Sequence, residues 1–240
     1  MTRTKEERLV LNQFKSNFKK EINLFRNILS TLQIILESSK TSTKDYNRNS
    51  VLVLAGLNYK GFTGSFDRIS KGYISDSEAI LKKTIESFLA QGYLFLNPAK
   101  AKKWYKGEME LKSLESNRLV LSKKLDILNN REKFFPTDKK DFFEGYVYRN
   151  FYKNSNEIAH LNSKLVLREM RFDRDGMIYD NTMVLGPKWD LEFTKIIINR
   201  IIMFSMFQAS LLATLFKVQN KEYERTFRKI YKYFEDKTSL

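Results

Sequence analysis

The sequence predicts an all-α protein, a bundle of about six to seven helices with one small β-hairpin. Only 3 prolines and 9 glycines occur in 240 residues, which favours long helices over a sheet-rich fold with many turns. Apolar residues make up 42% of the chain, which is enough for a packed core. In several long segments they recur at steps of three and four, the spacing of one helix face.

The first helix is predicted over residues 5–38, with the charged side chains lying off its apolar stripe. The stripe consists of Leu11, Phe14, Phe18, Ile22, Phe25, Leu29, Leu32 and Leu36. A polar linker follows over residues 39–49. We therefore divide the chain into an N-terminal helix with its linker, residues 1–49, and a helical bundle, residues 50–240. The two parts are expected to form one compact domain.

The second apolar segment, residues 50–69, contains Gly61 and Gly64 beside Lys60. A Gly-x-x-Gly next to a lysine occurs in the backbone clamp of KH-type RNA-binding domains. Those domains need a small sheet around the loop, and no strand pattern flanks this one. The favoured interpretation is that the two glycines allow a bend or close helix packing.

The middle of the chain carries further helix signals. Ser75 and Glu78 have the spacing of a capping box and predict a helix to about Leu96. Pro98 suits the first position of the next helix. Residues 99–133 are highly charged and predicted to be helical, either projecting as an arm or packed in the bundle. Another helix is expected from Pro136 towards His160.

An Asp-Gly pair between two apolar runs predicts the hairpin, near residues 164–185, with its turn at Asp173 to Gly176. A long helix should follow over residues 188–218 and a last one near residues 221–236. The stretch from Ile196 to Phe216 is the most apolar in the chain. Polar side chains interrupt it, so a central helix of a bundle is favoured over a membrane span.

The chain is strongly basic, with 43 Lys and Arg against 28 acidic residues and a formal net charge of +15. This balance favours RNA or another polyanion as a partner. The excess is spread over residues 1–26, 99–133 and 217–237 rather than held in one tail. The charged N-terminus and the absence of cysteine fit a cytoplasmic setting.

The same composition limits the chemistry. A single histidine and no cysteine exclude zinc sites built on several such ligands. No phosphate-binding glycine loop and no Gly-x-Ser-x-Gly elbow is present. Magnesium sites made of carboxylates alone remain open. We predict no cofactor and no bound metal.

The remaining candidate is the polar cluster Tyr152 to His160, at the end of an otherwise apolar helix. Histidine is the side chain best suited to proton transfer at cellular pH. The other interpretation is structural, because an imidazolium also interacts favourably with the C-terminal end of a helix dipole.

Two segments of the chain carry a resemblance. The first is Ile74 to Pro98, with Lys82 to Glu86 at its centre, and the second is Tyr152 to His160. Together with Leu185-Gly186-Pro187 they resemble a bacterial family of uncharacterised helical proteins. That family is similar to HEPN domains, the helical bundles of toxin–antitoxin and phage-defence ribonucleases. The likeness covers roughly residues 50–220.

The resemblance implies a homodimer whose cleft holds RNA, with an Arg and a His acting without metal. Here Lys153 stands at the Arg position, with six residues between it and His160. It supplies positive charge without the planar fork of Arg. His160 would be general base or acid and Lys153 would stabilise the phosphate. Substrate binding would fall to the remaining candidates, which are Tyr152, Asn154, Ser155, Arg149 and Glu86.

Two functions are therefore carried forward. One is an RNA-targeting toxin or phage-defence effector that cleaves or binds RNA, with an antitoxin or defence-system protein as a further partner. The other is a non-enzymatic helical module that binds a partner protein or nucleic acid. Exposure of His160 in a groove beside Lys153 favours the first, and burial of His160 against a core carbonyl favours the second.

Overall fold

A computed structural model describes residues 4–39, 41–110, 170–172, 178–183, 187, 189–218 and 221–238. Within these ranges the protein is all-α, as the sequence predicted. The helices are α1 (Lys5–Asn17), α2 (Lys19–Ser38), α3 (Tyr46–Ser70), α4 (Ile74–Leu96), α5 (Pro98–Tyr105), α9 (Leu191–Phe216) and α10 (Lys221–Thr238). Two short strands, β1 (Met170–Phe172) and β2 (Ile178–Met183), are also described.

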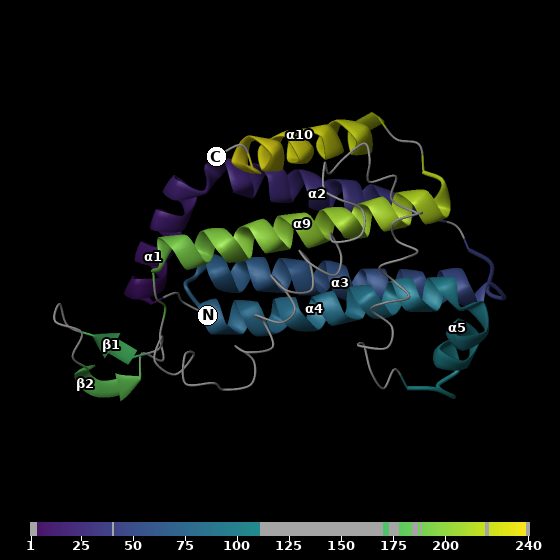
Figure 1. The fold of residues 1–240 in the computed structure, drawn as a ribbon, viewed down its shortest axis with the longest axis horizontal. Coiled ribbons are helices and arrows are strands. Elements are labelled where there is room, and N and C mark those ends of the chain that lie inside the picture. The colour runs from purple at the N-terminus through teal and green to yellow at the C-terminus, as the bar shows by residue number, and fades with distance from the viewer. Residues whose placement is uncertain are drawn as a thin grey trace.

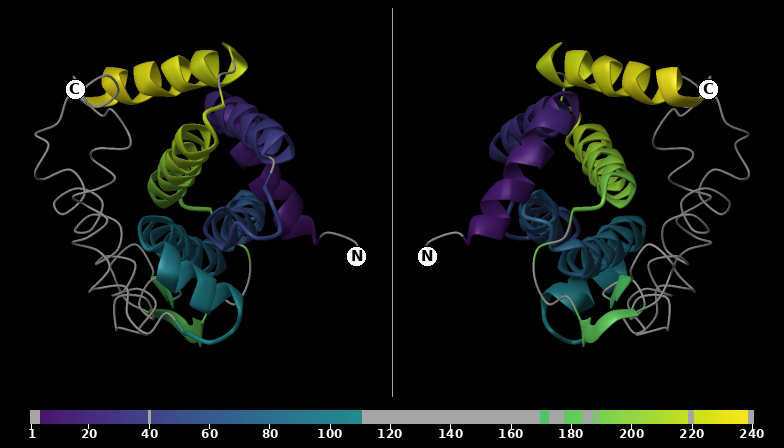
Figure 2. Two further views of the ribbon diagram at one scale, coloured as in Figure 1. Left: turned by 90° about the vertical axis from the view of Figure 1, so that its right-hand side faces the viewer. Right: turned by 90° about the vertical axis from the view of Figure 1, so that its left-hand side faces the viewer.

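The long helices stack in layers, with α10 over α2, α2 beside α9, and α3 and α4 on the far side of α9 (Figures 1 and 2). The helix α9 therefore lies between α2 and the pair of α3 and α4. It is long and apolar enough to cross a membrane, but 89% of that apolar window is buried inside the protein. Its fully buried side chains include Ile198, Ile202 and Phe204.

The helix predicted over residues 5–38 is two helices, so that prediction was wrong in its continuity. Phe18 leaves helical geometry at φ −119° and ψ 30°. Its ring is buried against Phe14, at 5.5 Å between centroids, and Trp189, at 6.2 Å. The bend lets α1 cross the bundle at an angle (Figure 2), where Glu7 accepts a 2.8 Å hydrogen bond from the Tyr73 hydroxyl.

The glycines of the second segment serve helix packing. α3 runs unbroken from Tyr46 to Ser70, so residues 60–64 form no KH-type loop. A Cβ placed on Gly61 would lie 2.0 Å from the Thr84 hydroxyl oxygen on α4, and one on Gly64 would lie 3.8 Å from Ile80. The absence of a side chain at Gly61 therefore sets how closely α3 and α4 approach.

The predicted capping box at Ser75 and Glu78 is wrong. Helix α4 begins at Ile74 with Tyr73 as its N-cap, so Ser75 already lies inside the first turn. Glu78 points into the core instead, where its Oε1 lies 3.5 Å from Nη1 of Arg200 on α9. The two side chains are 3% and 8% exposed. Pairing this buried charge outweighs the use of Glu78 as a cap.

Three smaller differences concern element bounds. The predicted linker over residues 39–49 is shorter, because Asp45 caps α3 and the helix starts at Tyr46. Within residues 99–133 the structure describes a short helix, α5, and the segment from 111 onward lies outside the described residues. The last two helices begin and end within a few residues of the predicted bounds.

The strands β1 and β2 are antiparallel, with Met170 opposite Met183 and Phe172 opposite Ile178, and the register shifts between the two pairs. Both strands fall within residues 164–185. The predicted turn at Asp173 to Gly176 lies outside the described residues.

Candidate nucleic-acid interface

Most of the predicted site residues lie outside the described residues, namely Arg149, Tyr152, Lys153, Asn154, Ser155 and His160. Glu86 is described and lies half-buried on α4. Glu86 lies ten residues before the last residue of α4, so the two are about 15 Å apart along the helix axis. The structure therefore does not test the polar cluster at His160, and the site below is one that sequence reasoning missed.

The structure gathers cations at one end of the bundle, where α2 passes to α3, α4 passes to α5, and α9 ends (Figure 1). We call this the basic end. Its cations are Lys44, Arg48, Lys100, Lys102, Lys103, Lys106 and Lys217. Its acidic residues are Glu37, Asp45, Glu108 and Glu110. All of these cations except the half-buried Arg48 are exposed, so phosphate groups can reach them from solvent.

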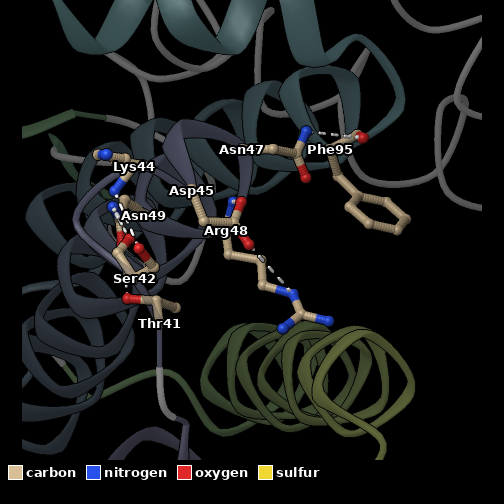
Figure 3. A network of polar contacts seen from close by, with 8 residues as sticks. All are labelled: Thr41, Ser42, Lys44, Asp45, Asn47, Arg48, Asn49 and Phe95. Atoms are coloured by element: carbon tan, nitrogen blue, oxygen red, sulfur yellow. Dashed lines mark hydrogen bonds and ion pairs between the residues drawn. The ribbon is translucent and has the colours of Figure 1, made fainter.

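A polar network fixes the turn that enters α3 (Figure 3). The Thr41 hydroxyl donates to Oδ1 of Asn49 at 2.5 Å, and the Asn49 amide donates to the Ser42 carbonyl at 3.0 Å. Asp45 accepts from the backbone N–H of Arg48 at 3.1 Å and so caps the helix. These hydrogen bonds tie the first turn of α3 to the segment that precedes it.

The first turn of α3 is also tied to its neighbours. The Asn47 amide donates to the carbonyls of Leu94 and Phe95 in the last turn of α4, at 2.9 and 3.0 Å (Figure 3 shows the bond to Phe95). The Ser50 hydroxyl donates at 2.7 Å to the Tyr46 carbonyl and also lies 3.3 Å from the carbonyl of Ala101, a fully buried residue of α5. Together these contacts join the start of α3 to the end of α4 and to α5.

Cations at the basic end lie over aromatic rings. The Tyr46 ring has the ammonium groups of Lys102 and Lys106 at 5.8 and 5.9 Å from its centroid, and the Tyr105 ring centroid at 5.8 Å. These distances are typical of cation–π pairs and of a tilted aromatic pair. Tyr105 is 45% exposed, so one face of this cluster is open to solvent.

A second cation–aromatic pair lies across the end of α9. The Arg48 guanidinium is 5.7 Å from the Phe216 ring centroid and 3.6 Å from the Asp45 carboxylate (Figure 3 shows it reaching over α9). Lys217 follows directly, in a left-handed conformation at φ 53°. The basic end is thus a strip that runs from α5, over the start of α3, to the end of α9.

Three tyrosines elsewhere hold their protons more tightly than usual. Burial and a hydrogen bond to Glu21 raise the pKa of Tyr233. A hydrogen bond to Glu7 raises the pKa of Tyr73, and burial raises that of Tyr223. At neutral pH these hydroxyls stay protonated and act as hydrogen-bond donors between helices rather than as proton-transfer groups.

Within the part of the chain that the structure describes, no group of three or more His, Asp or Glu side chains lies close enough to hold a metal ion. The chemistry available at the basic end is recognition. Ammonium and guanidinium groups attract phosphates, and exposed rings offer faces on which bases stack.

The sequence shows the excess of positive charge but not where the fold gathers it. The cations come from three separated segments, residues 44–48, 100–106 and 217, which only the fold brings together. The run Lys102-Lys103-Trp104-Tyr105-Lys106 is the one local signal that could have indicated the site, because it interleaves lysines with aromatic rings.

No protein-family model matches the chain, and no curated protein and no solved structure matches it either.

Proposed function

We propose that the protein binds RNA at the basic end and acts as an RNA-targeting effector of the toxin or phage-defence kind. The observation that supports this most is the collection of seven cations around the half-buried Tyr46 ring and the exposed Tyr105 ring, from three chain segments at one end of the bundle. Of the six cation–aromatic pairs in the described part of the chain, four lie at the basic end, and a nucleic-acid surface uses both kinds of group.

In this proposal the basic end supplies affinity, and the segment with His160 supplies chemistry. The resemblance to HEPN domains carries the second part. His160 acts as general base or acid on a ribose hydroxyl or leaving oxygen, Lys153 stabilises the phosphate charge, and two protomers form the cleft. The remaining candidates, Arg149, Tyr152, Asn154, Ser155 and Glu86, contact the strand.

RNA binding is tested by fluorescence anisotropy with a short labelled oligouridylate at about 50 and 200 mM salt. Affinity should fall steeply with salt, because each neutralised phosphate releases condensed counterion. Changing Lys102, Lys103 and Lys106 together to Ala should weaken binding and lower the slope of log K against log salt by about 2.

The matched control changes Lys5, Lys15 and Lys195 to Ala, which removes the same charge from exposed positions on α1 and at the start of α9. It should leave the slope nearly unchanged. An equal loss in both triple variants would show that total charge and not the basic end drives binding. A wild-type protein that binds no RNA at either salt would move the chain to the class of non-enzymatic modules that bind a partner protein.

The hairpin forms part of the same proposal, since it should follow the helix that ends at His160. We expect residues 164–185 to form one continuous hairpin that turns at Asp173 to Gly176 and includes β1 and β2. Extended carbon chemical shifts on both sides of the turn would support it, and helical shifts throughout the segment would contradict it.

A further inference from the structure

We infer that the basic end takes single-stranded RNA, with a base stacked on Tyr105, and discriminates against duplex RNA. The inference rests on the proposed RNA binding and names the form of RNA that the surface fits. Phosphates and base faces differ in how accessible they are to a protein. Phosphates are exposed in any nucleic acid, whereas base faces are accessible only where the strand is unpaired.

Tyr105 has the position that a stacking platform needs. It is the last residue of α5, it is 45% exposed, and lysines stand on both sides of it in sequence, at 102, 103 and 106. A surface that reads only phosphates gains nothing from an exposed ring among its lysines. With a ring present, a base can stack while the flanking ammonium groups meet the phosphates on either side.

The ring is also held in place. Helix α5 ends sharply because Gly107, at φ 74°, takes the left-handed position of a C-terminal cap. The backbone N–H of Gly107 donates to the Trp104 carbonyl and that of Glu108 to the Lys103 carbonyl, both at 2.9 Å. Ala101 is buried under the Ser50 hydroxyl, and Tyr46 packs beside Tyr105. Little ordering entropy is therefore lost when a base stacks.

The rest of the strip continues the path of a single strand. From Tyr105 it passes the Tyr46 ring, under Lys102 and Lys106, and reaches the Arg48–Phe216 pair and Lys217. Cations and rings thus alternate along the surface. This arrangement matches the stacking platforms and cationic grooves of single-strand binders rather than the purely cationic surface that suffices for a duplex.

The experiment compares an unstructured oligouridylate with a perfectly paired RNA duplex of the same length, for the wild type and for Tyr105→Ala. The wild type should bind the single strand more tightly. Tyr105→Ala should weaken single-strand binding by about 5- to 150-fold, the range for loss of one stacked base. It should leave duplex binding and the salt slope unchanged, because no phosphate contact is removed.

Two further variants keep the result clear. Tyr105→Trp should retain single-strand affinity, because a ring is restored. Leu9→Ala removes a comparably exposed apolar side chain from α1 and should change nothing. Circular dichroism should be the same for all variants, since Tyr105 is exposed and its loss creates no cavity.

The outcomes separate this inference from the proposed function. Equal affinity for single strand and duplex, or an unaltered Tyr105→Ala, overturns the single-strand inference and leaves RNA binding standing. No binding to either RNA overturns both. Binding to phosphatidylserine vesicles in place of RNA likewise overturns both, because it identifies a membrane headgroup as the polyanion.

Discussion

The two ends of the helical bundle use charge in different ways. At the end where α1 crosses, cations and acids are nearly balanced. The cations on α1, at the turn from α3 to α4 and at the start of α9 are Lys5, Arg8, Lys15, Arg68, Lys71 and Lys195, and the acids are Glu6, Glu7, Asp67, Asp76, Asp190 and Glu192. At the basic end the seven cations outnumber the four acids, which are Glu37, Asp45, Glu108 and Glu110.

The contacts at the α1 end explain where its acids go. Asp67 lies 2.7 Å from the Lys71 ammonium, and Asp190 accepts from the backbone N–H of Phe193 at the start of α9. Glu7 binds the Tyr73 hydroxyl. These acids pair, cap and join helices. At the basic end the lysines mostly face aromatic rings and solvent. The fold therefore shows where the excess positive charge gathers, which the sequence alone does not.

The largest effect we predict separates binding from chemistry. His160→Ala should lower RNA cleavage by about 10²–10⁴-fold, the contribution of general acid–base catalysis, and leave binding at the basic end intact. The Lys102, Lys103 and Lys106 variant should lower binding and cleavage together. Both are measured on the same purified proteins with a labelled oligouridylate, beside the melting temperature.

A His160→Ala variant with a lower melting temperature and no cleavage to lose would instead assign His160 a structural role. A wild-type protein that cleaves no RNA, alone or with its partner, would falsify the enzymatic part of the proposal.

The second prediction compares a buried cation with the exposed ones. Arg200 is 7% exposed and pairs with Glu78 in the core between α4 and α9. Arg200→Met should lower the free energy of unfolding by about 3–5 kcal/mol, because it leaves the Glu78 charge buried without its partner. RNA affinity of the folded variant should not change.

The double variant Glu78→Met with Arg200→Met should recover much of that stability, since apolar side chains then replace both members of the ion pair. Urea unfolding followed by circular dichroism measures both. An Arg200→Met variant as stable as the wild type would show that the Glu78–Arg200 pair makes no net contribution to the free energy of unfolding. A loss of RNA affinity in the folded Arg200→Met variant would place Arg200 in the interface and remove the distinction between buried and exposed cations.

The sequence predicted the helices better than the bends and caps between them. Apolar spacing found the helices, because burial of one face dominates helix stability in a bundle. It missed the bend at Phe18, where the stripe continues through a buried ring. After the bend the buried face of α2 centres on Phe25, Ile28 and Ile35, while Leu29 and Leu36 lie half-buried at its edge. A change of helix direction alters which residues face the core.

Local motifs failed where tertiary contacts competed with them. Glu78 has capping-box spacing, but its place opposite Arg200 depends on a helix 122 residues later in the chain. The basic end has the same origin, since Tyr46 meets Lys102 and Arg48 meets Phe216 only in the folded chain. The candidates around His160 came from local composition and from the resemblance, and lie outside the described residues.

The smallest predicted effect tests whether the basic end keeps a cation at a cost in stability. Helices α5 and α9 end in the same hydrogen-bonding pattern, in which the N–H two residues past the cap reaches back to a carbonyl five residues earlier. In α5 the left-handed position is Gly107, and in α9 it is Lys217, at φ 53°. For a residue with a Cβ this conformation costs about 1–2 kcal/mol.

Lys217→Gly should therefore change stability and RNA binding in opposite directions. The free energy of unfolding should rise by up to about 1 kcal/mol, because the strain exceeds the extra chain entropy that glycine loses on folding. RNA affinity should fall, and the salt slope should drop by about 0.7, the contribution of one phosphate contact to a single strand. Lys217→Asn, which also tolerates the left-handed region, removes the charge without the flexibility of glycine. Higher stability with unchanged RNA binding in both variants would show that the strained lysine does not contact RNA, and would end the strip at Arg48.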